Sequence, residues 1–246
     1  MASTAGPPSE PRPEREESSG EMSPLLGANF ARQGDGEKTI KNLGNGSAWL
    51  AQVGLIVLIL LVVVSVFDHP ILLVSGHPLS QIVGISAIVQ SILVLQPTHL
   101  DKQKIQGQRW HAAIHVISFL SFVAGVTVIE CNKMYNGLEH FHSAHAYIGV
   151  ITCGVLVLQY LVGITMWAVP VLYGGVDNAK SVWKYHRWSG YLLLLLLLAS
   201  VISATRTDYV KSVLEIKTHY VVLASAVILL GVFPRVSLKK LGLKRR

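Results

Sequence analysis

Charged residues are scarce in this sequence. Asp, Glu, Lys and Arg together make up 14% of its 246 residues, whereas an average soluble protein contains about 25%. Hydrophobic residues make up 51%. Such a chain has too little polar surface to cover a water-soluble domain of this size. The shortage of charge therefore excludes an ordinary soluble domain and predicts a membrane protein in contact with lipid.

Cysteine is scarcer still, with two residues in the whole chain, Cys131 and Cys153. One falls in an expected loop and the other inside an expected membrane span, so we do not expect them to form a disulfide. The spacing Cys-x-x-Cys is absent, which argues against a zinc or thiol–disulfide site. We interpret both residues as inert thiols and look for the chemistry in other side chains.

Acidic residues are also few: 14 Asp and Glu stand against 21 Lys and Arg, and the formal net charge is +7. An excess of positive charge suits nucleic acid when the basic residues form one patch. Here they form short clusters between apolar blocks. We therefore expect no nucleic-acid partner, and we interpret the clusters as signals of membrane topology.

Six apolar blocks occupy most of the chain, each near the roughly 20 residues needed to cross a bilayer core. Backbone groups in lipid must form their hydrogen bonds within the segment, and the alternation typical of barrel strands is absent. We therefore expect an all-α membrane protein whose transmembrane domain covers residues 47–236. The expected helices are residues 48–67, 78–96, 111–130, 145–169, 185–205 and 219–234.

The basic residues are divided unequally between the two sets of connecting segments, and the richer side is expected to be cytosolic. This assignment places both termini in the cytosol. The richer set contains Lys38, Lys41, Lys102, Lys104, Arg109, Lys180, Lys184, Arg187, Arg235, Lys239, Lys240, Lys244, Arg245 and Arg246. The poorer set contains Lys133, Arg206, Lys211 and Lys217.

Both tails are polar. Residues 1–46 are rich in Pro, Glu, Ser, Gly and Arg without periodicity, so we expect a disordered cytosolic tail and no secretory signal peptide. Residues 237–246 form a basic cytosolic C-terminal tail. Within the first tail, EMSPLL (Glu21 to Leu26) fits the acidic dileucine pattern. It indicates an endosome, lysosome or vacuole membrane, with the plasma membrane or the endoplasmic reticulum as alternatives.

Ten histidines are many for so apolar a chain, and four of them open consecutive expected helices: His77, His111, His145 and His186. Successive helices run in opposite directions, so the second and fourth helices start at one face of the membrane and the third and fifth at the other. The histidines thus form one pair near each face. Each pair has the two imidazoles that ligate one haem iron between the helices of a bundle.

Two of the four histidines are followed by a glycine one helical turn later, His145 by Gly149 and His186 by Gly190. Residues four apart share one face of a helix, so a glycine there removes a side chain that would collide with a flat macrocycle. The spacing favours haem over a bare metal ion. It leaves open how the helices of the other two histidines make room.

Three further histidines are weighed as site residues. His115 lies one turn from His111 on the same face and is the alternative ligand, but Arg109 and Trp110 place His111 at the membrane boundary, so we prefer His111. His140 and His142 precede His145 on the non-cytosolic side. Either could contact a substrate or a haem propionate.

These features resemble the cytochrome b561 family of transmembrane electron-transfer haemoproteins, in particular its small members with six helices. The resemblance covers about residues 48–236. It rests on SAHAYIG around His145, on KYHRWSG around His186, and on the succession of four histidines at helix starts.

The resemblance implies two b-type haems, one held by His77 and His145 and the other by His111 and His186. It implies that these ligands lie in a central four-helix bundle, with the first and sixth helices at its periphery. It further implies ascorbate or a similar cytosolic reductant as donor, and a ferric chelate or monodehydroascorbate as acceptor on the opposite side. Homodimers are common in the family.

One departure from the family concerns the donor site. The ascorbate-using branch has an Ala-Leu-Leu-Val-Tyr-Arg run at the end of the second helix, whose arginine helps to hold the anionic donor. This chain has SILVLQ, and Gln96 lacks the charge. We expect Lys102, Lys104 and Arg109 to meet the donor instead, because their charges suit a carboxylate or a haem propionate. His140 is the candidate on the acceptor side.

The function expected from the sequence is one-electron transfer across the membrane. Two other classes remain in competition with it. HAAIH and HFHSAH resemble the histidine clusters of non-haem di-iron membrane oxygenases of the desaturase type, although here the histidines are split between the two faces. A non-redox transporter or scaffold with incidental histidines is the other alternative, but the apolar blocks show none of the paired interruptions typical of transporters.

Overall fold

A computed structural model describes residues 32–236 of the chain. Six of its helices are long and apolar enough to cross a membrane, and this part of the chain contains no strand. The prediction of an all-α membrane protein with six spans is thereby confirmed. The helices are α1 (Ala48–Phe67), α2 (Gly76–Leu95), α3 (Asp101–Asn136), α4 (Ala144–Ala168), α5 (Val176–Ala204) and α6 (Thr218–Val232).

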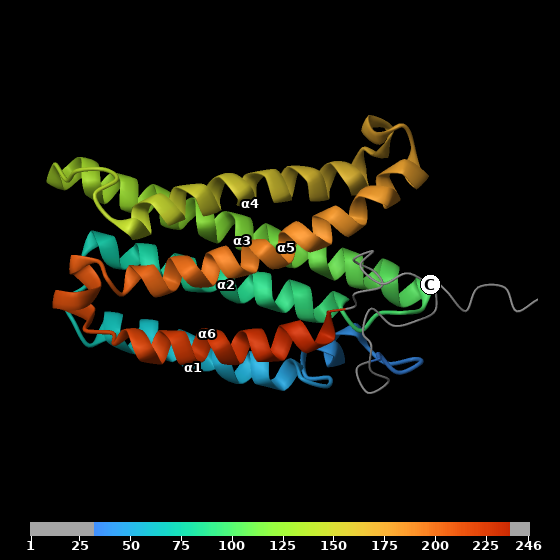
Figure 1. The fold of residues 1–246 in the computed structure, drawn as a ribbon, viewed down its shortest axis with the longest axis horizontal. Coiled ribbons are helices and arrows are strands. Elements are labelled where there is room, and N and C mark those ends of the chain that lie inside the picture. The colour runs from blue at the N-terminus through green and yellow to red at the C-terminus, as the bar shows by residue number, and fades with distance from the viewer. Residues whose placement is uncertain (1–31, 237–246) are drawn as a thin grey trace, which may run out of the picture.

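The helices run alternately up and down the bundle, so the two ends of the described chain lie at the same end (Figure 1). We call this the terminal end and the other the distal end. At the terminal end, the Ser47 hydroxyl donates to the carbonyl of Gly231 at 2.9 Å, which joins the start of α1 to the end of α6. Figure 1 also shows α1 and α6 side by side along one edge, next to α2, with α4 at the opposite edge. Helices α2 to α5 therefore form a four-helix group with α1 and α6 on one side of it, in line with what the resemblance implied.

Close packing of α1 against α6 depends on two glycines. A Cβ atom on Gly54 would lie 2.7 Å from the Ala224 carbonyl oxygen, and one on Gly231 would overlap the backbone of Ala51. Small residues let two membrane helices approach closely, which increases van der Waals contact where lipid provides no hydrophobic driving force. Helices α1 and α6 are thus held together by van der Waals contact between closely spaced backbones, and neither helix carries one of the four paired histidines.

Helices α3 and α5 begin about ten residues before their expected starts, at Asp101 and Val176. The sequence prediction followed the apolar blocks, which mark only the part of a helix that lies in lipid. The preceding charged turns contain good helix formers and continue the helices beyond the membrane boundary. His111 and His186 are consequently the eleventh residues of their helices, whereas His77 and His145 are second residues.

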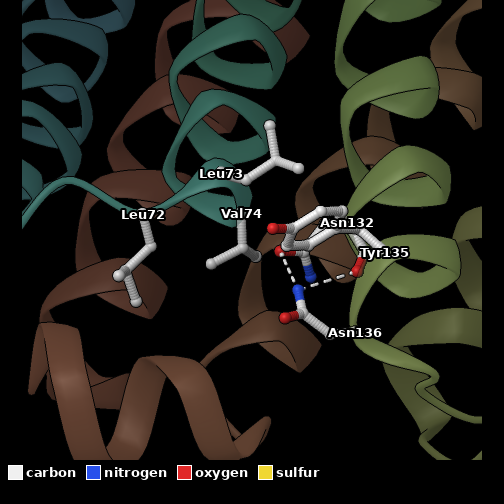
Figure 2. Close-up of a pocket in the computed structure, with 6 residues that line it drawn as sticks. All are labelled: Leu72, Leu73, Val74, Asn132, Tyr135 and Asn136. Atoms are coloured by element: carbon white, nitrogen blue, oxygen red, sulfur yellow. Dashed lines mark hydrogen bonds between the residues drawn. The ribbon is translucent and has the colours of Figure 1, made fainter.

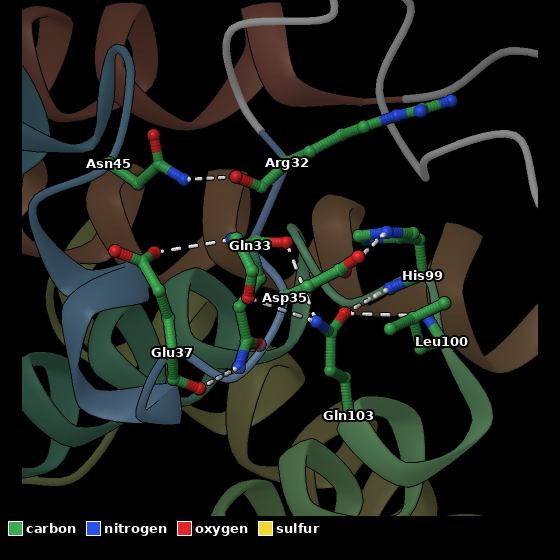
Figure 3. Close-up of polar contacts among 9 residues, drawn as sticks. Arg32, Gln33, Asp35, Glu37, Asn45, His99, Leu100 and Gln103 are labelled. Atoms are coloured by element: carbon green, nitrogen blue, oxygen red, sulfur yellow. Dashed lines mark hydrogen bonds and ion pairs between the residues drawn. The ribbon is translucent and has the colours of Figure 1, made fainter.

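The segment before α1 is folded from residue 32, although we expected disorder through residue 46. Its short helix η2 (Thr39–Leu43) leads into α1. The amide of Gln33 donates to the Pro97 carbonyl at 3.1 Å, and the side chain of Asn42 donates to the Val94 carbonyl at 2.8 Å. Figure 3 shows Gln103 of α3 reaching back to the same segment. Buried amides thus tie it to the α2–α3 connection.

Residues 1–31, including the dileucine pattern, and the basic residues 237–246 lie outside the described residues.

Candidate functional site

The four histidines at the predicted sites meet as two pairs. The ring centroids of His77 and His145 are 6.1 Å apart at the distal end, and those of His111 and His186 are 6.4 Å apart nearer the terminal end. In each case one histidine comes from α2 or α3 and the other from α4 or α5. His77 contacts Gly125, which lies fourteen residues along α3 from His111. The two layers are therefore about 21 Å apart along the helix axis.

Three of the four rings are oriented by a backbone carbonyl of the neighbouring helix. A carbonyl can only accept, so Nδ1 carries the proton and Nε2 keeps a lone pair for a metal. The three contacts are His77 Nδ1 to Gly125 O at 2.9 Å, His111 Nδ1 to Ser91 O at 3.0 Å, and His145 Nδ1 to Ser200 O at 3.0 Å.

The spacing of the rings fits an iron placed between them. A metal–imidazole bond is about 2 Å long, so two axial imidazoles on one iron have ring centroids about 6 Å apart. Both observed separations agree with this distance. At Gly149, a Cβ atom would meet nothing within 4 Å, so the face of α4 beside His145 is open to a flat group. The ring separation thus fits haem ligation at both layers, and the open face at Gly149 adds room for a flat group at the layer of His145.

His186 is held differently from the other three histidines. Among the described residues its Nδ1 has no hydrogen-bond partner, and its ring packs on Gly163, where a Cβ atom would lie 3.1 Å from Cε1. The side-chain amide of Gln159 donates to the His186 carbonyl at 2.6 Å, and the hydroxyl of Ser189 donates to Gln159 Oε1 at 2.7 Å. Gln159 therefore links α4 to the backbone that carries His186.

Gly190 makes room for that amide. We expected Gly190 to leave space for a macrocycle, but a Cβ atom there would lie 3.0 Å from Gln159 Nε2. The absence of a side chain is thus explained in the structure by the approach of Gln159. The two His-x-x-x-Gly spacings look alike in sequence, yet their glycines face different surroundings.

His115 lies beside His111 but has its Nε2 engaged. Its Nε2 is 3.0 Å from the Ser91 hydroxyl, while the Ser91 carbonyl contacts His111 Nδ1. The two histidine rings are 4.3 Å apart, and His115 also lies edge-on to Tyr160 at 5.5 Å. His111 is the one whose Nε2 is free, which fits our preference for it as the ligand.

The residues that orient the histidines were missed by sequence reasoning, although a regular spacing marks them. Each of the helices α2 to α5 carries one of the four paired histidines. The residue fourteen positions later on the same helix lies at the level of the other layer, where it forms a hydrogen bond with the histidine of the neighbouring helix. These residues are Ser91, Gly125, Gln159 and Ser200. Three act through the carbonyl, which every residue type has, so their identity gave no signal.

The candidate donor residues lie on the first turns of α3, at the terminal end. Lys104 forms a 3.2 Å ion pair with Asp101, while Lys102 and Arg109 are exposed. Gln96 does not face this surface. It is buried, and its amide donates to the Tyr191 hydroxyl and to the Val232 carbonyl, both at 3.2 Å.

The candidate acceptor residue His140 is exposed at the distal end, where its Nε2 lies 2.8 Å from a carboxylate oxygen of Glu130. His142, in contrast, lines a cavity of about 280 Å³ next to His145, between the start of α4 and the end of α5. A second cavity, of about 320 Å³, lies between the α1–α2 connection and the end of α3. Figure 2 shows that Leu72, Leu73, Val74 and Tyr135 line it, with Asn136 bonded to Asn132. It contains none of the paired histidines.

A di-iron site would need several ligands gathered at one place. Between residues 32 and 236, no group of three or more His, Cys, Asp and Glu side chains has that arrangement. The histidines of HAAIH and HFHSAH lie on different layers, at opposite ends of the bundle. The geometry therefore favours paired axial ligands over a di-iron cluster.

The fold defines a helical membrane protein in which four histidines are paired in two layers. The family model described as eukaryotic cytochrome b561 matches residues 68–211. This is more than half of the chain, and the chain belongs to the cytochrome b561 family. The family predicted from the histidine pattern is therefore confirmed.

Curated relatives carry names of one functional type. The chain is 27% identical over 140 residues to the lysosomal membrane ascorbate-dependent ferrireductase CYB561A3 of Rattus norvegicus, covering 56% of this chain and 54% of the relative. It is 24% identical over 135 residues to the Homo sapiens protein of the same name, covering 55% and 52%. It is 22% identical over 127 residues to the transmembrane ascorbate-dependent reductase CYB561 of Bos taurus, covering 51% and 49%. The chain spans about half the length of the curated relatives it matches.

Proposed function

We propose that the protein is an oxidoreductase that moves single electrons across a membrane. Ascorbate or a similar reductant donates at the terminal end, and a ferric chelate or monodehydroascorbate accepts at the distal end. The observation that carries the proposal is the pair of imidazole layers, each with the ring separation of a bis-histidine iron site and about 21 Å apart along the helices. The names of the relatives support the class of donor.

Two b haems are the cofactors of this proposal. His77 and His145 would hold one, and His111 and His186 would hold the other. When bound, each haem supplies a one-electron couple between ferrous and ferric iron. The carbonyls of Gly125, Ser91 and Ser200 fix the protonated nitrogen of three histidines and leave the opposite nitrogen with a lone pair that would bind the iron.

The protein's own residues also determine which chemistry is avoided. Two imidazoles would hold each iron, from His77 and His145 at one layer and from His111 and His186 at the other, and the chemistry that a haem would supply there is electron transfer. The lipid-facing helices exclude water from the space between the layers and keep the local dielectric low. Both effects favour transfer of an electron through the protein over reaction at the metal.

The donor is proposed to bind at the terminal end, near Lys102 and Arg109. Both cations are exposed on α3 within the first three turns, where they would attract an anion such as ascorbate to the layer that contains His111. The basic residues of the same end predict that it faces the cytosol. The lysosomal names of two relatives and the dileucine pattern support an endosomal or lysosomal membrane.

Reconstituted vesicles test the function. The purified protein is inserted into vesicles loaded with ferric citrate, ascorbate is added outside, and the haem absorbance and internal Fe(II) are followed. We expect a sharp reduced b-type band, followed by haem reoxidation and Fe(II) formation inside. Vesicles without protein and vesicles with His145→Ala serve as controls. A protein that stays colourless after haem supplementation, or haems that ascorbate leaves oxidised, would contradict the proposal.

A further inference from the structure

The cavity beside His145 combines charges of both signs with direct access to a proposed haem ligand. We call it the Arg206 cavity. It is lined by His142, Ser143, Ala144, His145, Ser203, Arg206, Thr207 and Asp208. It lies at the distal end, where electrons would leave the protein. At about 280 Å³ it is close to the smallest volumes typical of small-ligand sites.

Arg206 has an unused guanidinium. The residue is exposed, and within residues 32–236 its side chain forms no hydrogen bond or ion pair. Asp208 also lines the cavity, but its carboxylate lies too far from Arg206 for an ion pair. A fork of donors that is not neutralised within the chain is suited to a carboxylate, which it can bind with two parallel hydrogen bonds.

The same cavity contacts the histidine layer through Ser203. The Ser203 hydroxyl donates to the Ser200 carbonyl at 2.7 Å, and it lies 3.4 Å from His145 Nδ1. A molecule in the cavity would therefore lie beside His145 itself and beside the serine that contacts its ring. His140, the acceptor residue expected from sequence, is instead paired with Glu130 and does not line the cavity.

We propose that the Arg206 cavity is the acceptor site, and that it takes a ferric chelate with carboxylate arms. This inference rests on the proposed function and specifies its substrate class. Arg206 binds a carboxylate arm, while Asp208 faces the cationic metal centre. Monodehydroascorbate has an anionic part but no cationic centre, so the opposite charges favour the chelate. Reduction adds one electron, which converts Fe(III) to Fe(II) without forming or breaking a covalent bond, and the donor on the opposite face supplies that electron.

The test compares Arg206→Gln with Lys211→Gln in the vesicle assay. Lys211 is exposed at the same end, on the segment after Arg206, and lies outside the cavity, so its variant loses the same charge elsewhere. We expect Arg206→Gln to raise the KM for ferric citrate about ten-fold, because a charge-assisted hydrogen bond is lost. Lys211→Gln and the wild type should keep the same KM. The KM for cationic hexaammineruthenium(III) should not rise in either variant.

A second measurement separates the acceptor from another carboxylate, a propionate of the haem at His145. The absorption spectrum and midpoint potentials of both haems are recorded without any acceptor. Unchanged haem properties together with a higher KM for ferric citrate support the proposal. A shifted potential with an unchanged KM would assign Arg206 to the propionate and overturn it, as would an unchanged KM with unchanged haems. Reduction of the haems by ascorbate in the Arg206→Gln protein shows separately that the proposed function is intact.

Discussion

Replacement of one histidine in each layer tests the assignment of the ligands. His145 belongs to the distal pair and His186 to the other, and the two pairs share no ligand. The layers are about 21 Å apart along the helices, beyond the roughly 10 Å within which substitutions usually influence one another. We therefore expect His145→Ala and His186→Ala each to lower the haem content from two per chain to one.

The two variants must also lose different haems. Haem is quantified as the pyridine haemochrome per mole of protein, and electron paramagnetic resonance distinguishes the two low-spin ferric signals. His145→Ala should lack one signal and His186→Ala the other. His140→Ala is the matched control, because this exposed histidine is paired with Glu130 outside both layers; it should retain two haems. Loss of both haems from either variant would refute the separate pairs, and full retention in both would refute the ligand assignment.

Two further substitutions address the support of the site and the packing of the bundle. Gln159→Leu removes the amide that donates to the His186 carbonyl at 2.6 Å; the resonance signal and midpoint potential of that haem should shift while the other haem is unchanged, and equal shifts in both would argue against a local role. Gly231→Ala places a methyl group against the backbone of Ala51 and should lower the free energy of unfolding by about 1–3 kcal/mol, seen as a lower Tm. Gly44→Ala is its control, because a Cβ atom there meets nothing within 4 Å, and a similar loss in both variants would contradict the packing argument.

The membrane spans were predictable because lipid imposes a length and a composition that a linear sequence displays. The pairing of the histidines was predictable for a related reason: the alternating direction of successive helices decides which helix starts share a face. The true starts of α3 and α5 were not, because their first turns lie outside the apolar blocks and contain charges such as Asp101. Hydropathy indicates which residues contact lipid, and it does not indicate the residue at which a helix begins.

The local support of the ligands was harder to predict. Backbone carbonyls orient His77, His111 and His145, and no side-chain type identifies a carbonyl that accepts. The folded segment around Gln33 escaped prediction because buried amides hold it to the end of α2 and to the α2–α3 connection. Contacts of this kind depend on three-dimensional proximity and leave no periodicity in the sequence.

The hydrogen bonds that orient the paired histidines also hold the helices together in pairs. Helix α2 is joined to α3 at both layers, through His77 with Gly125 and through His111 with Ser91. Helix α4 is joined to α5 at the same two levels, through His145 with Ser200 and through the Gln159 amide. None of these bonds requires a metal.

The contact between the two helix pairs is of another kind. Tyr160 of α4 donates to Ser118 of α3 at 2.9 Å, and Gln96, the residue after α2, donates to Tyr191 of α5 at 3.2 Å. At the layers themselves, the facing imidazoles are about 6 Å apart, too far for a direct hydrogen bond and suited to an iron between them. The hydrogen bonds within each pair do not involve a metal, and a haem bound as proposed would add further links between the two pairs. Folding of the helix pairs would then precede assembly of the sites, and haem would stabilise the bundle as well as conduct electrons through it.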